Sequence, residues 1–330
     1  MSRHDRAVEN MANSSLAQQQ YSFEIPPTLV TGPMNLVETV LSAQTSEPEW
    51  VRDGDSFTDV EVFGETPVKY TVSQTGPADK FALTVRVLAS YLNEDTIEKI
   101  KRHLEQVLGL KDDIGLFYRK FSRQNEPLKS TFLKLRGLRL MRGTNLYEGL
   151  ICSMLSQNNS ARLWNRTARL MMQHYGRRVN LPDGSSSFLF PNAEDLGKLN
   201  PKELQSKTSM GYRAKPVVEV SRMITNGDFN LEALPNLSYD EALARLVELP
   251  GVGPKVADCF LLYGAGRLEA APVDVWIHRI VSKLYFRGRK VSRLKTARFL
   301  RERYGEWAGY AQLYLFDYAR RAKPTAPKRK

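Results

Sequence analysis

The sequence predicts an α+β protein, with a small antiparallel β-sheet N-terminal domain followed by a larger all-helical domain. Two patterns support this prediction. Segments in which apolar and polar residues alternate, rich in Val, Phe, Tyr and Thr, stop before residue 112. After that point apolar residues recur at helical spacing, and Gly, Pro and Asn separate the segments. The chain has 330 residues, enough for two or three domains.

The sheet domain is predicted over residues 21–111, after a polar segment, 1–20, that we expect to be disordered. Strands are predicted in "DVEVFG", "VKYTVSQ" and "FALTVRV", and a helix is predicted in "NLVETVLSA" (35–43). The stretch "TIEKIKRHLEQVLGL" (96–110) predicts an amphipathic helix. One face of that helix carries Ile97, Ile100, His103, Leu104, Val107 and Leu108.

The helical domain is predicted over residues 112–321, with no strands. A basic tail, 322–330, follows it, and we expect this tail to be disordered. Helices are predicted in "LYEGLICSMLSQ", "SARLWNRTARLMMQHYG", "KPVVEVSRMIT", "YDEALARLVEL", "PKVADCFLLYG", "DVWIHRIVSKLYF", "RLKTARFLRERYG" and "WAGYAQLYLFDYARR".

Composition excludes several kinds of site. Only two cysteines occur, Cys152 and Cys259, which excludes a disulfide framework and a four-thiolate iron–sulfur cluster. None of the four histidines has partners at zinc-ligand spacing, so we expect no transition metal. The sequence has no apolar run of about 18 residues and no apolar signal segment. We therefore expect an intracellular protein, in the cytoplasm or nucleoid, or in the nucleus of a eukaryote.

The positive charge is concentrated near the C-terminus. The chain carries a net charge of +12, and residues 277–330 contain 16 Lys and Arg but only three acidic residues. A basic face at one end of a protein suits a polyanion, because neutralising phosphates releases counterions. The alternative is a solubilising surface with a basic tail.

The stretch "LPGVGPKVADC" (249–259) predicts a tight hairpin between two helices. Gly251 and Gly253 let the backbone turn sharply and approach another chain closely, and Pro254 suits the first position of a helix. The amides of Gly251, Gly253 and Lys255 then form a nest for an anion, such as a phosphate, at a helix N-terminus. The alternative is an ordinary helical hairpin.

Lys255 lies in the first turn of an apolar helix, where a cation opposes the helix dipole. One interpretation is a solvated lysine near a helix end. The other is a nucleophile, because a helix N-terminus and partial burial both favour the neutral amine, which can attack carbon.

Asp274 in "APVDVWIHRI" precedes an apolar-periodic helix, so we expect it to cap that helix. A capping carboxylate is held rigidly, which is also what a catalytic carboxylate needs.

These motifs together resemble the helix–hairpin–helix (HhH-GPD) DNA glycosylase superfamily, and within it the 8-oxoguanine DNA glycosylases with AP-lyase activity. The resemblance covers about residues 112–321. It is weaker before residue 112, where it suggests the sheet domain found in that branch and in the related alkylpurine glycosylases. It implies that Lys255 attacks the anomeric carbon of the sugar and forms a Schiff base. It also implies that Asp274 helps to activate the lysine and stabilises the cationic sugar, before β-elimination cuts the strand.

The same resemblance implies residues that replace a flipped-out base, because such an enzyme must take its target out of the stack. In "LSQNNSAR" and "MGYRAK", Gln157 and Tyr212 fall on the plug and the wedge. Arg162 and Arg213 fall on the readers of the orphaned cytosine. The alternatives are a polar cluster at a helix end for Gln157 and a packed tyrosine for Tyr212.

The resemblance further implies a base pocket. Gln312 falls on the glutamine that bonds the Watson–Crick edge, and Phe316 falls on the ring that stacks on the base. Cys259 falls on the other side of the base, and Pro272 completes the pocket. Gly32 is the candidate for the carbonyl that distinguishes oxidised from normal guanine. The alternative for Phe316 and Cys259 is a place in the apolar core.

No cofactor is required, but the family hairpin binds a monovalent or calcium ion that bridges to a phosphate. The backbone carbonyls implied here are those of Val247, Leu249 and Val252. Two departures from the family pattern occur. Gln157 stands where close members have asparagine, and Trp276 stands where they have a phosphate-binding histidine. His278 or a nearby arginine is the candidate replacement for that histidine.

The sequence thus predicts a bifunctional DNA glycosylase and AP lyase that excises 8-oxoguanine from damaged double-stranded DNA. We expect a monomer with no membrane partner. Two alternatives remain at this point. One is a glycosylase of the same fold that acts on alkylated purines, and the other is a non-catalytic helix–hairpin–helix module that binds DNA.

Overall fold

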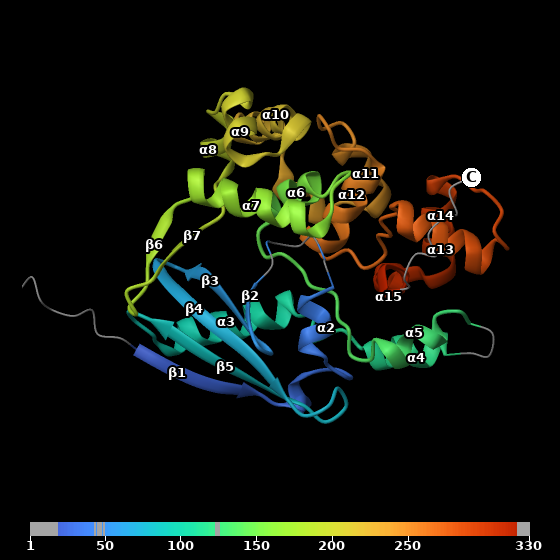
Figure 1. Cartoon of the computed structure of the whole chain (residues 1–330), viewed down its shortest axis with the longest axis horizontal. Coiled ribbons are helices and arrows are strands. Elements are labelled where there is room, and N and C mark those ends of the chain that lie inside the picture. The colour runs from blue at the N-terminus through green and yellow to red at the C-terminus, as the bar shows by residue number, and fades with distance from the viewer. Residues whose placement is uncertain (1–18, 43, 45–47, 49, 123–125, 322–330) are drawn as a thin grey trace, which may run out of the picture.

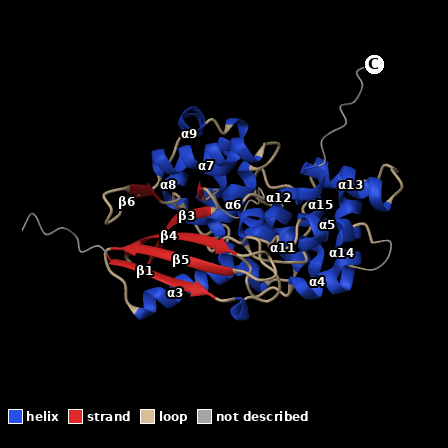
Figure 2. Ribbon diagram, turned by 60° about the horizontal axis from the view of Figure 1, so that its bottom comes forward, coloured by secondary structure: helices blue, strands red, loops and turns tan. Residues whose placement is uncertain are grey.

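The computed structural model describes residues 19–42, 44, 48, 50–122 and 126–321 (Figure 1). The protein is α+β, as predicted: an antiparallel sheet from the N-terminal residues lies beside a larger group of helices (Figure 2). Each part has its own buried apolar cluster. No described helix is long and apolar enough to cross a membrane. The tail 322–330 lies outside the described residues, and the proposed division into domains stays a prediction.

The main sheet has five strands in the order β1-β5-β4-β3-β2, and every neighbouring pair is antiparallel. The predicted strands are β3, β4 and β5, and their alternation points Tyr70 and Val72 into the core. Residues 1–18 lie outside the described residues. The expected disorder is wrong for Gln19 and Gln20, because both pair with β5. The strands are β1 (Gln19–Ile25), β2 (Val51–Asp53), β3 (Ser56–Phe63), β4 (Thr66–Thr75) and β5 (Ala82–Ala89).

Two helices accompany the sheet, with a short 3₁₀ turn, η1 (Pro27–Leu29), after β1. Helix α2 (Leu36–Val40) is shorter than the predicted span. Helix α3 (Glu94–Val107) begins two residues earlier than predicted, because the Asn93 side chain caps it by accepting the Thr96 amide at 2.8 Å. The predicted apolar face of α3 packs on the sheet, with its aliphatic residues at 100, 104 and 107 fully buried.

Arg139 joins the sheet part to the helical part. Its side chain is fully buried, and its guanidinium donates to the backbone carbonyls of Pro33 at 3.1 Å, Gly109 at 2.6 Å and Thr31 at 2.7 Å. Burial lowers the pKa of this guanidinium, but its donors are satisfied, which limits the cost of burying the charge. Arg139 therefore holds the loop 31–33 against the start of the helical part.

The remaining chain is mostly helical, and the predicted helices all occur. Short elements that periodicity did not reveal join them, among them α4, α5, α8 and α9. The helices are α4 (Ile114–Phe121), α5 (Lys129–Lys134), α6 (Leu146–Leu155), α7 (Ala161–Tyr175), α8 (Ala193–Gly197), α9 (Pro201–Thr208), η2 (Gly211–Arg213), α10 (Ala214–Thr225), η3 (Leu231–Asn236), α11 (Tyr239–Leu246), α12 (Pro254–Cys259), the π-helical turn η4 (Phe260–Gly264), α13 (Val275–Tyr285), α14 (Arg293–Tyr304), η5 (Gly305–Trp307) and α15 (Ala308–Arg321).

The prediction that strands stop before residue 112 is wrong at one place. A second, two-stranded sheet pairs β6 (Arg178–Asn180) with β7 (Ser186–Phe188). Each strand has three residues, which is too short for alternation to show in the sequence. The turn between the strands reaches the main sheet, where Asp183 forms an ion pair with Lys69 at 2.8 Å.

An acidic cavity of about 270 Å³ lies between β3, α6 and α7. The carboxylates of Asp59, Glu61 and Glu148 line it, and all three side chains are partly buried. Burial raises the pKa of Asp59 to about 6. Burial, together with the charge of Asp59, raises the pKa of Glu61 to about 7. The pKa of Glu148 is raised further, again chiefly by burial.

We expect Glu61→Gln to stabilise the protein at about pH 8 by about 1–2 kcal/mol and to leave its stability near pH 4 unchanged. The pKa of Glu61 is raised in the folded state, so this group contributes stability below its ordinary value of 4.5 that is lost as pH rises through about 7. Thermal or urea unfolding at both pH values measures the effect. Glu65→Gln, on the exposed β3–β4 turn, is the matched control. Equal stabilisation by Glu61→Gln at both pH values would contradict the charge explanation.

Candidate active site

The predicted hairpin is present between α11 and α12. Helix α11 begins with a capping box, in which Ser238 and Glu241 exchange side-chain-to-backbone bonds. Gly251 has φ +74°, and a Cβ there would lie 2.7 Å from Pro216 Cβ, so the turn requires glycine at this position. Gly253 has an ordinary φ of −94°. A Cβ on Gly253 would meet open space, so the first turn of α12 is free to meet another molecule.

Lys255 lies in the first turn of α12, and its side chain is half-buried, as predicted. Its Nζ donates to the Ser156 hydroxyl at 2.9 Å. Ser156 in turn donates to the Ser153 carbonyl at 2.7 Å, so the hydroxyl offers its lone pairs to the amine. Ser156 follows α6, which packs against α12. The end of α6 therefore fixes where the amine points.

Asp274 is the N-cap of α13, as predicted, and its Oδ1 accepts the Ile277 amide at 2.8 Å. Lys255 and Asp274 both line one cavity of about 250 Å³. The two also act on the same thiol: burial raises the pKa of Cys259, Lys255 lowers it and Asp274 raises it. The structure thus places an amine and a rigid carboxylate at one hollow, which is what the nucleophile interpretation requires.

Four other residues predicted for the base pocket line this cavity: Cys259, Pro272, Gln312 and Phe316. Gln312 is buried, and its Oε1 accepts a hydrogen bond from the Tyr263 hydroxyl at 3.2 Å. The amide nitrogen of Gln312 is thereby left as a donor. The cavity thus offers an aromatic ring, a thiol and an oriented amide.

Gly32 is not among the residues that line this cavity, and its place in the base pocket stays a prediction. The carbonyls of its neighbours, Thr31 and Pro33, are held by buried Arg139. A Cβ on Gly32 would lie 2.9 Å from the Gly115 amide nitrogen of α4. The hydrogen bonds of Arg139 to the residues on either side of Gly32 therefore hold Gly32 against α4.

Three of the residues predicted to invade the stack form one cluster beside the hairpin. The Tyr212 hydroxyl donates to Gln157 Oε1 at 3.0 Å, and Gln157 Nε2 donates to the Gly251 carbonyl at 3.4 Å. The Arg213 guanidinium donates to the Gln157 carbonyl at 3.0 Å and lies 4.6 Å from the Tyr212 ring centroid. Tyr212 is 57% exposed, as a wedge must be. We call Gln157, Tyr212 and Arg213 the loop cluster.

Among the described residues, Arg162 forms no hydrogen bond or ring contact with the loop cluster. It is exposed on the first turn of α7, in a shallow hollow shared with Arg166 and Arg169. In contrast, Arg213 already uses two nitrogens on the Gln157 carbonyl. The roles of both arginines toward an orphaned base stay predictions.

Of the two departures noted in the sequence, Gln157 belongs to the loop cluster and Trp276 lies at the cavity. Trp276 lines the cavity and is 39% exposed, with the Arg279 guanidinium 5.9 Å from its ring centroid. His278 bonds the Val291 carbonyl through Nε2 at 2.7 Å, so that nitrogen carries the proton. Of the two candidate replacements for the missing histidine, the arginine is therefore the better placed.

The sequence interpretation missed seven lining residues: Ser156, Asn159, Ser160, Ala161, Trp164, Tyr263 and Arg320. Five of them had a detectable signal. Arg320 lies four residues after Phe316 on α15, on the face already predicted to meet the base. Ser156, Asn159, Ser160 and Ala161 belong to the quoted stretch "LSQNNSAR". The other two, Trp164 and Tyr263, are helical residues that became lining residues through packing. Among the described residues, no group of three or more His, Cys, Asp or Glu could hold a metal ion.

Comparisons with known proteins agree on one family. The family described as "HhH-GPD superfamily base excision DNA repair protein" matches residues 151–306. A protein of Methanothermobacter thermautotrophicus named "Probable N-glycosylase/DNA lyase" is 34% identical over 310 residues, which cover 88% of this chain and 95% of the relative.

Two solved structures share the fold. The 8-oxoguanine glycosylase/lyase of Clostridium acetobutylicum, in complex with DNA containing cytosine opposite 8-oxoG, matches with a TM-score of 0.74 at 27% identity. That match covers 88% of this chain and 92% of the other. The 3-methyladenine DNA-glycosylase of Archaeoglobus fulgidus matches with a TM-score of 0.73 at 23% identity, covering 92% of this chain and 99% of the other. The second likeness is one of fold alone.

Proposed function

This chain belongs to the HhH-GPD superfamily of base excision DNA repair proteins and is a DNA glycosylase with AP-lyase activity; we propose that it excises 8-oxoguanine through a Schiff base on Lys255. One observation carries the proposal: the Lys255 amine and the Asp274 carboxylate line the same cavity as Gln312 and Phe316. A glycosylase that only activates water needs a carboxylate but no amine in that place. The amine is what adds lyase chemistry.

The proposed reaction begins with the neutral Lys255 amine attacking the anomeric carbon of the flipped-out nucleotide. The N-glycosidic bond breaks, and the base leaves with the bonding electron pair and takes up a proton. Asp274 stabilises the positive charge that develops on the sugar. Opening of the sugar ring gives the Schiff base. Loss of a proton from the neighbouring carbon then expels the 3′ phosphate, which cuts the strand.

The loop cluster supplies the proposed means of flipping. The exposed Tyr212 ring and the Gln157 amide stand together beside the hairpin, where they can replace a base that has left the stack. The hairpin amides of Gly251, Gly253 and Lys255 are proposed to bind a phosphate of the lesion strand. Such backbone contacts position DNA without reading its sequence.

The basic end of the chain offers further contacts to phosphates. Five exposed cations lie between the end of α13 and the first turn of α14, and none of them has an ion pair within the described part of the chain. The His278–Val291 bond ties this segment to α13, the helix that Asp274 caps. Free cations on this segment suit the DNA flanking the lesion. They are Arg287, Arg289, Lys290, Arg293 and Lys295.

An ion at the hairpin remains a proposal. The carbonyls of Val247, Leu249 and Val252 form an all-oxygen donor set, which suits a monovalent cation or calcium. The Leu249 carbonyl accepts the Val252 amide at 3.1 Å, and its second lone pair stays available. The ion would bridge the hairpin to a phosphate. We also propose that the protein binds damaged double-stranded DNA as a monomer.

A panel of lesion-bearing duplexes tests the proposal. We expect release of 8-oxoguanine, and a covalent adduct when borohydride reduces the Schiff base during the reaction. Efficient release of methylated purines with no trapped adduct would instead support the alkylpurine alternative. DNA binding with no release of any base would support a non-catalytic module, although the cavity that joins Lys255 to Asp274 favours an enzyme.

A further inference from the structure

The last helix carries a buried carboxylate that the proposed chemistry does not use. Asp317 follows the pocket residue Phe316 on α15 and is fully buried. Its Oδ1 accepts a hydrogen bond from the Arg320 guanidinium at 2.6 Å, and its Oδ2 lies 2.5 Å from Nε of Arg321. A buried carboxylate is costly unless it is paired. Each Asp317 oxygen therefore has an arginine within ion-pair distance, but only Oδ1 accepts a hydrogen bond, and both arginines lie at the end of α15.

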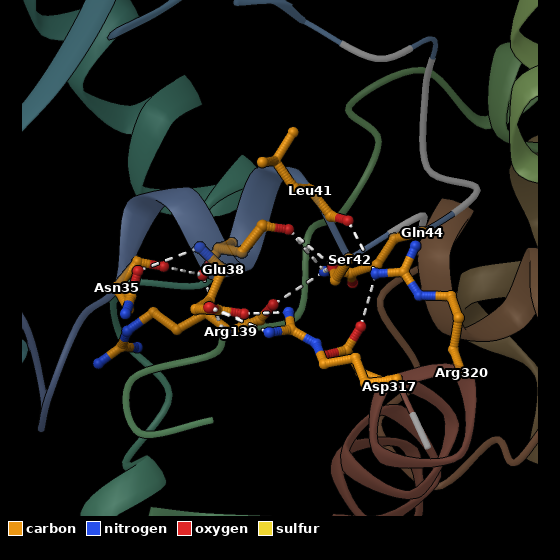
Figure 3. Close-up of polar contacts among 10 residues, drawn as sticks. Asn35, Glu38, Leu41, Ser42, Gln44, Arg139, Asp317 and Arg320 are labelled. Atoms are coloured by element: carbon orange, nitrogen blue, oxygen red, sulfur yellow. Dashed lines mark hydrogen bonds and ion pairs between the residues drawn. The ribbon is translucent and has the colours of Figure 1, made fainter. Parts of the chain in front are cut away.

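Arg320 contacts both the cavity and the end of α2. It lines the cavity that holds Lys255 and Asp274. Its Nη2 also donates to the Leu41 carbonyl, at the end of α2, at 3.0 Å. Figure 3 shows this guanidinium between Asp317 on one side and Leu41 on the other. One side chain thus connects the wall of the cavity to the sheet part of the molecule.

A second bond holds the same helices together. Arg321 Nη1 donates to Glu38 on α2 at 3.2 Å, so α15 binds α2 at Glu38 and again at Leu41. The neighbouring described residues are fixed as well: the Gln44 amide donates to the Arg139 carbonyl at 2.9 Å and accepts the Met141 amide at 2.7 Å. These bonds keep the end of α2 from moving away from Arg320.

We propose that Asp317 and Arg320 form a clamp that holds a fixed positive charge in the wall of the base pocket, and that this charge selects neutral oxidised purines over cationic alkylated ones. The proposal rests on the proposed function. Asp317 is the positioning residue, and Arg320 determines specificity. The only charged side chains that line the cavity, within the described part of the chain, are Lys255, Asp274 and Arg320. The counterion of Arg320, Asp317, is fully buried and is not among the lining residues, so the guanidinium is the part of this pair that faces the cavity.

The chemistry of the bases makes this charge selective. A guanidinium has five N–H donors, and the bonds to Leu41 and Asp317 use only Nη2. The remaining donors suit a base rich in carbonyl oxygens, and 8-oxoguanine has two of them. Purines methylated at ring nitrogens in DNA, such as 7-methylguanine, carry a positive charge, which a nearby guanidinium repels.

The test compares three substrates: duplexes that carry 8-oxoguanine, 7-methylguanine or a preformed AP site. We expect Arg320→Ala to slow 8-oxoguanine release by about 10- to 100-fold, which corresponds to losing a charged hydrogen bond. Release of 7-methylguanine should be unchanged or faster. AP-site cleavage should be unchanged, because that substrate has no base to place against the wall.

Two further variants separate specificity from structure. Arg320→Lys keeps the charge and should restore part of the discrimination, whereas Asp317→Asn should weaken discrimination in the same direction as Arg320→Ala. Arg52→Ala is the matched control, because Arg52 also bonds one carbonyl and one carboxylate, those of Gly54 and Asp55, but lies on the β2–β3 turn. Melting temperatures measured alongside identify any variant that is merely unfolded.

The proposal is overturned if Arg320→Ala or Arg320→Lys slows all three substrates equally, or if neither variant changes the ratio of 8-oxoguanine to 7-methylguanine release. Failure of the proposed function has a different signature. In that case the wild-type protein itself would release no 8-oxoguanine, whatever residue stands at position 320.

Discussion

Lys255→Gln should abolish strand cleavage and the borohydride-trapped adduct, and should lower base release by about 10⁴-fold or more, because it removes the nucleophile itself. Gln is similar in length to Lys, and its amide can still donate to the Ser156 hydroxyl that now receives Lys255 Nζ. The cavity therefore stays filled, and the loss is chemical rather than structural. Single-turnover assays on 8-oxoguanine and AP-site duplexes measure it.

The control for this variant is Lys198→Gln, which removes an exposed lysine whose ion pair with Glu194 lies after α8, outside the cavity lining. Both variants should bind the lesion duplex, because the hairpin and the loop cluster are intact. A trapped adduct that persists in Lys255→Gln would show that another amine attacks the sugar. Binding lost together with catalysis would point instead to damage at the hairpin.

Asp274→Asn should slow base release by about 10²- to 10⁴-fold while leaving the fold stable, because asparagine caps a helix about as well as aspartate. The Asn oxygen can still accept the Ile277 amide. What disappears is the negative charge that stabilises the cationic sugar. Excision rates and melting temperatures of the same preparation measure the two effects separately.

Asp274→Ala separates the two roles further. It should lose the same activity and, in addition, about 1 kcal/mol of stability, because the cap itself is gone. If Asp274→Asn retains wild-type activity, the carboxylate is a cap and nothing more. That interpretation was open in the sequence, and only this pair of variants distinguishes it from catalysis.

Local sequence patterns were enough to predict where the proposed catalytic residues, Lys255 and Asp274, lie on their helices. A glycine turn before Lys255 and an apolar-periodic helix after Asp274 determine where those two residues stand on their helices, and the structure agrees. The same periodicity placed Gln312 and Phe316 on one face of α15. Elements of three to six residues, such as β6, α5 and α8, gave no such signal, because a period cannot be read from so short a segment.

The sequence by itself placed the longer strands and helices, the hairpin, and the positions of Lys255 and Asp274 at the starts of their helices, because each of these depends on residues close to one another along the chain. Only the tertiary structure decided which side chains form the walls of the cavity. Arg139 holds the loop 31–33 through backbone carbonyls, and Arg320 connects the cavity to the end of α2. Such contacts join segments that are distant along the chain. The local spacing of residues therefore cannot predict which arginine will bond to which backbone carbonyl.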